Sequence, residues 1–171
     1  MQETAKDLDA LQQLPDRSYA NAGAHLSAIF TETSRLSAAE VADSLAGIFE
    51  MHLATTTADG APFVAPIDGL FFKGKIWFGV PAAAIRAKHV RRDARVSASY
   101  TRDQSFTFVV HGEARGVTPS DALFATYVAY MQECYVALYG TQWLQRYERR
   151  QQTTGDDFTG YIESKRLFVK R

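Results

Sequence analysis

The chain has 171 residues, of which 46% are hydrophobic, and this suits one domain with a buried core. Lysine plus arginine equals aspartate plus glutamate at 19 each, so no overall field favours nucleic acid or an anionic membrane, and we expect neither partner. Cys134 is the single cysteine, which excludes an internal disulfide and any CxxC site. Because the first residues also lack the apolar stretch of a signal peptide, we expect a soluble cytoplasmic protein.

Residues 1–36 are weakly patterned, and we predict that they form an N-terminal extension to a barrel domain over residues 37–171. Leu8, Leu11 and Leu14 follow one another at roughly helical spacing until Pro15, which is expected to stop the run. The pattern predicts a short helix followed by a loop, both packed on the barrel.

The next segment begins with a capping box from Ser37 to Glu40, which predicts a helix over 38–50. One apolar stripe on this helix would lie against the sheet, and it comprises Val41, Leu45, Ile48 and Phe49.

Between residues 52 and 117, short apolar-rich runs are separated by turn dipeptides, which is typical of an antiparallel meander. Asp59-Gly60 and Lys73-Gly74 supply the glycines that tight hairpins need. With a closing run at 158–169, the pattern predicts a mainly β fold with flanking helices (α+β), built on a six-stranded antiparallel split β-barrel. The runs of the meander are 52–57, 62–67, 70–72, 75–80, 95–101 and 105–117.

One connection, PAAAIRAKHVRRD at 81–93, is too long and too helix-prone for a hairpin, and it predicts a helix over 83–91. It concentrates positive charge in Arg86, Lys88, Arg91 and Arg92. A charge run of this kind is usually a solvated face, but at the edge of a small barrel it also suits an anion site. We expect Arg91 and Arg92 to face solvent or to pair with acids such as Asp93.

Two further helices are predicted near the C-terminus, over 119–139 and 141–151. Thr118, Pro119 and Asp121 suit the start of the first, and its apolar residues occupy nearly every face. Gln132 and Glu133 argue against a membrane span, so we expect this helix to be buried between the subunits of a homodimer.

Four segments occur in the order and spacing of a known family: LATTTADGAPFVAPI (53–67), KGKIWFGV (73–80), RAKHVRRDARVSASY (86–100) and VVHGEARGV (109–117). Together they resemble the FMN-binding split barrels related to pyridoxamine 5'-phosphate oxidase, a family with deazaflavin-using members. The resemblance implies an FMN-binding split-barrel fold and a homodimer with two flavin sites at the subunit interface.

The resemblance also implies where the cofactor lies. The isoalloxazine ring would contact the backbone of two strands, here at Ala65, Pro66, Ile67, Asp68, Phe78, Gly79 and Val80. In the family pattern K-x-x-N-L-R-R-D-P-R-V the first basic residue holds the phosphate. Arg86 takes that position here, Lys88 is a neighbouring candidate, and His89 replaces the asparagine as a possible donor to the phosphate or ribityl chain. His89 is equally suited to cap the helix end, and Asp68 to act as a turn acid.

We therefore predict an oxidoreductase that binds FMN or a deazaflavin coenzyme and transfers hydride or electrons to or from a small molecule. No residue is assigned a catalytic role and no metal site is expected, because the sequence has neither a nucleophile elbow nor clustered His, Cys and acidic residues. The C-terminus lacks the tryptophan and arginine substrate residues of true pyridoxamine phosphate oxidases, so that reaction is not assigned. The alternative is a non-catalytic barrel that binds flavin, deazaflavin or haem for storage or sensing. Trp77 and the tyrosines of helix 119–139 either cover a ring system or belong to the core.

Overall fold

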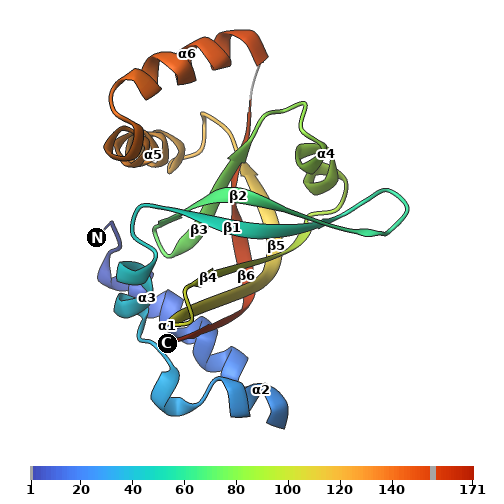
Figure 1. Ribbon diagram of the computed structural model, residues 1–171, viewed down its shortest axis with the longest axis vertical. Coiled ribbons are helices and arrows are strands. Elements are labelled where there is room, and N and C mark those ends of the chain that lie inside the picture. Colours follow the sequence, from blue (N-terminus) through green and yellow to red (C-terminus); the bar gives the residue numbers. More distant parts are fainter. Residues whose placement is uncertain (1, 155–156) are drawn as a thin grey trace.

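Six antiparallel strands close into a barrel at the centre of the molecule (Figure 1). The computed structural model describes residues 2–154 and 157–171. Around the barrel the order is β1-β2-β3-β6-β5-β4, and β4 pairs with β1 to close it. The predicted six-stranded antiparallel barrel with flanking helices is confirmed. The strands are β1 (Ile48–Thr56), β2 (Pro62–Phe72), β3 (Lys75–Val80), β4 (Arg95–Arg102), β5 (Phe106–Val117) and β6 (Phe158–Lys170).

Two tight turns connect the first three strands, as predicted. Gly60, between β1 and β2, has φ of 88°, whereas Lys73 and Gly74, between β2 and β3, have φ of 52° and 69°. In the turn between β2 and β3 both central residues have positive φ, which is typical of a type I′ turn, whose twist matches that of the flanking strands. These local signals therefore set the register at the start of the barrel.

β2 is one continuous strand where the sequence showed two runs separated at Asp68 and Gly69. Both residues pair with β1, opposite Glu50 and Phe49. A Cβ atom on Gly69 would lie 2.6 Å from the Phe49 ring, so glycine is needed here for close packing rather than for a turn. The interpretation of Asp68 as a turn acid is therefore wrong.

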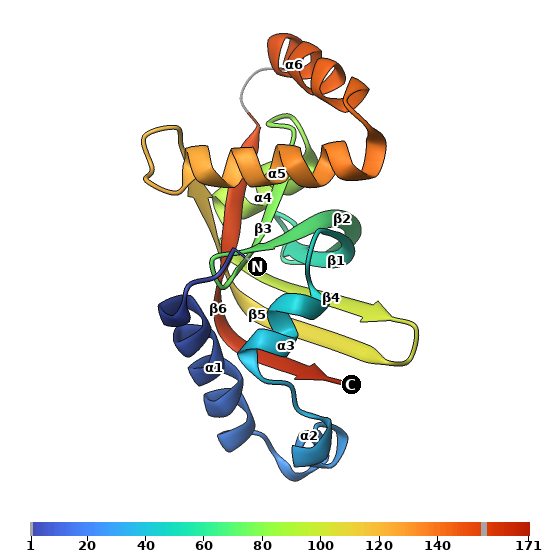
Figure 2. The ribbon, with the colours of Figure 1, turned by 90° about the vertical axis from the view of Figure 1, so that its left-hand side faces the viewer.

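Helices gather at both ends of the barrel (Figures 1 and 2). Helices α1, α2 and α3 lie at the end that holds the C-terminus, and α5 and α6 lie at the other end. Helix α4 connects β3 to β4. Their bounds are α1 (Ala5–Ala20), α2 (Ala24–Ile29), α3 (Ala38–Ser44), α4 (Ile85–Arg92), α5 (Phe124–Tyr139) and α6 (Gln142–Thr154), with a short 3-10 helix at Glu32–Ser34.

Helix α1 is held against β6, so the expected packing of the N-terminal segment on the barrel is observed. Leu11 and Leu14 belong to the main core, and the Tyr19 hydroxyl lies 2.5 Å from the Val169 carbonyl oxygen and 3.0 Å from the Val169 amide nitrogen. The expected stop at Pro15 is wrong, because the helix continues to Ala20. Proline removes one helical hydrogen bond, and the burial of this face against the barrel compensates for it.

Helix α3 begins with the predicted capping box between Ser37 and Glu40 but ends at Ser44, so the prediction of a helix over 38–50 is wrong. Gly47 adopts a φ of 78°, which redirects the chain, and β1 begins at Ile48. The apolar residues of 48–49 suit either a helix or a strand, and their pairing with β2 decides for the strand.

Helix α5 starts at Phe124, later than the predicted residue 119. The Asp121 carboxylate accepts a hydrogen bond from the Thr118 N–H at 2.7 Å and closes a separate turn before the helix. The capping signal of Thr118 and Asp121 therefore forms a turn of its own and does not start the helix.

An aromatic contact attaches α5 to the barrel. Tyr127, which is 1% exposed, stacks on Trp77 with ring centroids 4.2 Å apart. Phe72 and Leu70 complete this cluster, and the Trp77 indole N–H donates to the Phe72 carbonyl oxygen at 2.9 Å. Trp77 is therefore part of the core between β2, β3 and α5.

The remainder of α5 is only partly covered. Leu123, Leu138 and Tyr139 are 37%, 58% and 50% exposed. Within residues 2–154 and 157–171, none of the helices combines the length and the hydrophobicity needed to cross a bilayer. The helix thus presents an apolar surface that the other described residues leave open.

Candidate functional site

A cavity of about 570 Å³ lies between the barrel and the hairpin formed by α5 and α6. One wall comes from β1, β2, β3 and α4, and the opposite wall comes from the two helices. The barrel wall includes Glu50, Pro66, Ile67, Asp68, Gly79 and Arg86.

Several residues implied by the family resemblance meet at this cavity although they come from three separate elements. Pro66, Ile67 and Asp68 lie in β2, Gly79 in β3 and Arg86 in α4. A Cβ atom at Gly79 would contact only the Phe158 carbonyl oxygen, at 3.8 Å, so the surface over this glycine is open. The barrel wall therefore presents open backbone at Gly79 and the Arg86 guanidinium to the cavity, together with the carboxylates of Glu50 and Asp68.

The neighbouring predicted residues do not place side chains at this wall. Phe78 and Val80 are 1% and 2% exposed in the barrel core, because successive strand residues face opposite sides. Ala65 is half-buried and does not line the cavity. The predicted contact of these residues through their backbone stays a prediction.

Arg86 occupies the first turn of α4 and reaches back to β2. Its Nη1 donates to the Pro66 carbonyl oxygen at 2.8 Å. This bond fixes the guanidinium at the cavity wall, and it uses one of the five N–H donors that arginine offers. The remaining donors suit a phosphate or carboxylate, which arginine binds as a fork.

Lys88 and His89 lie elsewhere, although they belong to the same helix. Lys88 is exposed and does not line the cavity. His89 is 3% exposed and faces β1, where its Nδ1 lies 2.9 Å from the Thr55 hydroxyl and its ring meets Phe63 edge-on. The imidazole thus holds α4 against the barrel and is directed away from the cavity.

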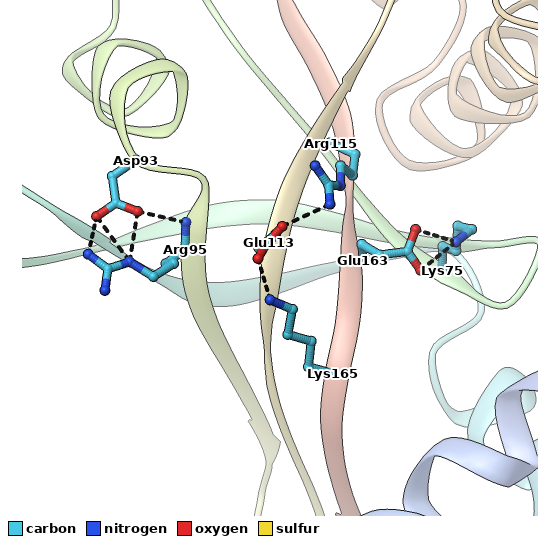
Figure 3. Close-up of polar contacts among 7 residues, drawn as sticks. All are labelled: Lys75, Asp93, Arg95, Glu113, Arg115, Glu163 and Lys165. Atoms are coloured by element: carbon cyan, nitrogen blue, oxygen red, sulfur yellow. Dashed lines mark hydrogen bonds and ion pairs between the residues drawn. The ribbon is translucent and has the colours of Figure 1, made fainter.

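The other two basic residues of this helix bind backbone carbonyls. Arg91 donates to the Ala82 oxygen at 3.1 Å, and Arg92 donates to the Thr56 oxygen. Asp93 instead pairs with Arg95 at 2.6 Å (Figure 3), an interaction that lowers its pKa to about 2. Arg91 and Arg92 are both exposed, so of the two expected alternatives the solvent-facing one is confirmed and the pairing with Asp93 is not.

A row of parallel aromatic rings forms the helical wall. Tyr135 stacks on Trp143 with centroids 4.5 Å apart and planes at 8°, and Trp143 stacks on Tyr147 at 4.9 Å and 15°. Tyr139 lies beside Tyr135 at 6.1 Å and 19°. The sequence interpretation considered the α5 tyrosines but missed Trp143 and Tyr147. Their i, i+4 spacing at the start of the next helix was the available signal.

Asp68 and Tyr135 join the two walls. The Tyr135 hydroxyl donates to Asp68 Oδ2 at 2.6 Å. Burial and this carboxylate raise the pKa of Tyr135 well above its usual value, so the phenol stays protonated and acts as a donor. The Asp68 carboxylate is thereby held at the cavity surface as a hydrogen-bond acceptor.

The rim of the cavity carries charges of both signs. Arg150 pairs with Asp157 at 2.6 Å and connects the end of α6 to the segment before β6. Arg146 lines the same rim. No histidine or cysteine is among the described lining residues, and within the described parts of the chain no group of three His, Cys, Asp or Glu could hold a metal ion. The side chains that line the cavity offer stacking, hydrogen bonding and anion binding.

No protein-family model matches the sequence, and no curated protein matches it either. Solved structures with a similar fold include the conserved hypothetical protein Rv2991 from Mycobacterium tuberculosis, with a TM-score of 0.64, 21% identity, and coverage of 82% of this chain and 88% of that one. HutZ, the haem storage protein from Vibrio cholerae, gives a TM-score of 0.56 at 18% identity over 71% and 85% of the two chains. A FAD-binding protein from Mesorhizobium loti gives 0.53 at 15% identity over 79% and 93%. At such identities the likeness establishes a shared fold, and the chain is therefore similar in architecture to proteins described as haem-storing and FAD-binding.

Proposed function

We propose that the protein binds FMN, or a related flavin or deazaflavin, in the cavity between the barrel and the α5–α6 hairpin, and that it acts as an oxidoreductase on a small molecule. The observation that carries this proposal is the convergence of Arg86 with Pro66, Asp68 and Gly79 around one cavity. Its volume of about 570 Å³ lies within the range of roughly 300–1,000 Å³ that is typical of small-ligand pockets.

The residues present fit a planar ring with an anionic tail. Tyr135, Trp143 and Tyr147 line the cavity as a row of mutually stacked rings, and the ring edges and the outer face at the end of the row would contact a planar ligand. Arg86 would bind the phosphate, and its hydrogen bond to Pro66 already holds the guanidinium in place. Asp68, oriented by Tyr135, would accept a hydrogen bond from a ligand N–H.

When bound, a flavin supplies the hydride or electron transfer. The chain's own residues would bind and orient it, and the α5–α6 hairpin would restrict water at the cavity. This division of roles agrees with a cavity wall that holds aromatic rings, one anchored arginine and a paired carboxylate. A non-catalytic haem- or flavin-binding role is the second candidate. It is favoured by the likeness to HutZ and by Met131 and tyrosines in the cavity, side chains able to ligate haem iron.

Absorbance and thermal stability of the purified protein test the proposal. We expect either bound flavin, visible in the absorption spectrum, or a rise in melting temperature when FMN is added, because a ligand that binds the folded state stabilises it. A Soret band from added haem, without any response to flavins, would favour the second candidate. A colourless protein whose melting temperature changes with neither ligand would contradict both.

We also propose that the protein is a cytoplasmic homodimer in which α5 is covered by a second copy. The support is the apolar surface of this helix, where Leu138 is 58% exposed. Light scattering at micromolar concentration should give twice the chain mass. Leu138→Glu, which would bury an unpaired charge in the interface, should give the monomer. A monomeric wild type, or an unchanged dimer in the variant, would contradict this interface.

A further inference from the structure

A second concave surface, of about 710 Å³, lies at the opposite end of the barrel, among α1, α2, β5 and β6. It shares no lining residue with the cavity described above. Its basic side chains come from one helix and two strands, and no aspartate or glutamate is among its described lining residues. These side chains are Arg17, His111, Lys165 and Arg166.

The positive charge at this surface is mostly uncompensated. Arg17 and Arg166 make no ion pair and no side-chain hydrogen bond within residues 2–154 and 157–171. Lys165 contacts Glu113, but that carboxylate also accepts from Arg115 at 2.8 Å, so one acid serves two cations (Figure 3). Because the chain as a whole has no net charge, this concentration is local.

His111 stands inside this group. It faces Arg166 across the β5–β6 ladder, and its Nδ1 lies 2.8 Å from the Ser97 hydroxyl of β4. Burial and the charge of Arg166 lower the pKa of His111. After burial, the charged neighbour that lowers this pKa is the cation Arg166, whereas a close carboxylate would raise it.

We propose that this surface binds a small polyanion, a molecule with two or more phosphate or carboxylate groups, through Arg17, Lys165 and Arg166. Arg17 alone has another explanation, since it lies in the last turn of α1, where the helix dipole favours a cation. Arg166 lies in a strand and has no such partner. The buried Phe168 and the neighbouring Ala22 form an apolar side of the surface, which lowers the local dielectric and strengthens charge pairing.

Calorimetry at low ionic strength with the full chain tests the proposal, with pyrophosphate and citrate as probes for the two kinds of anionic group. Arg17→Gln and Arg166→Gln should each weaken binding roughly tenfold, the loss expected for one charged partner. Lys6→Gln is the matched control, because Lys6 lies in the same helix as Arg17 but outside the concave surface. Lys6→Gln should change the affinity for either probe less than twofold, because salt screens a charge that does not touch the bound anion.

A second readout follows the imidazole of His111 by nuclear magnetic resonance. The bound polyanion should raise its pKa, and this effect should shrink in Arg166→Gln. The groups that face His111 are Arg17 from α1, Ser97 from β4, Glu113 from its own strand, and Lys165 and Arg166 from β6. Thermal melting of each variant checks that it is folded, which is expected because the replaced side chains are exposed.

Binding of either probe with loss in the two arginine variants supports the site. Absence of binding by both probes at millimolar concentration, or equal weakening by Lys6→Gln, would overturn it. Pyrophosphate binding that is lost in Arg86→Ala but kept in Arg17→Gln and Arg166→Gln would place the anion in the proposed flavin cavity and overturn this site, so the two proposals fail separately.

Discussion

Replacing Arg86 by alanine removes the guanidinium that joins α4 to β2 at the cavity wall. We expect the affinity for FMN to fall while the affinity for riboflavin stays the same, because only FMN carries a phosphate. A hydrogen bond to a charged group contributes about 1.5–3 kcal/mol. Since 1.4 kcal/mol corresponds to a factor of ten, the Kd for FMN should rise roughly tenfold to a hundredfold.

The fold itself should tolerate this change. Within the described residues, the Arg86 side chain makes one hydrogen bond, to the Pro66 carbonyl oxygen, and Pro66 is exposed, so water can replace the lost donor. The free energy of unfolding should therefore fall by about 1 kcal/mol or less. Urea unfolding of the variant verifies that a change in affinity reflects the site.

Fluorescence titrations of FMN and of riboflavin into wild type, Arg86→Ala and Lys88→Ala measure the affinities. Lys88 is the matched control, because it carries the same charge in the same helix but is exposed and away from the cavity. Equal weakening of FMN by both variants would show only a general charge effect. Equal weakening of riboflavin and FMN by Arg86→Ala would refute the phosphate contact.

Three further predictions concern other residues of the two walls and α4. Trp143→Ala removes the middle ring of the stack, and an aromatic contact contributes about 0.5–1.5 kcal/mol. FMN and riboflavin should therefore both bind roughly two- to tenfold more weakly to this variant. Unchanged titrations would show that the stack has only a structural role. His89→Ala leaves the buried Thr55 hydroxyl without its partner, so the free energy of unfolding should fall by about 1–3 kcal/mol, as measured by urea denaturation. A loss of FMN affinity without a loss of stability would instead place His89 at the phosphate. The folded state raises the pKa of Tyr135, so its stabilising effect is complete below the unfolded pKa of about 10 and is lost as the pH rises above that value. Tyr135→Phe should therefore show a smaller fall of the urea midpoint from about pH 9 to about pH 11 than wild type, and parallel curves would disprove the contribution of the Asp68 bond.

The sequence by itself determined the features that depend on neighbours along the chain. Gly60 and Gly74 fixed the two hairpins through their positive φ, and Ser37 with Glu40 fixed the start of α3. The position of Arg86 at the start of a helical crossover also followed from the motif. These signals are local, so they remain readable without the tertiary structure.

Only the tertiary structure decided the features that depend on distant partners. Pairing between β1 and β2 places Ile48 in a strand rather than in the predicted helix, and it places Asp68 within β2 rather than in a turn. Packing of α4 on β1 directed His89 inward, and the turn between α5 and α6 brought Trp143 onto Tyr135. A short apolar run fits two periods, and a ring on one helix has no preferred neighbour until a second helix folds back on it. The long-range pairing of strands and helices therefore selected which of the candidate residues share one cavity.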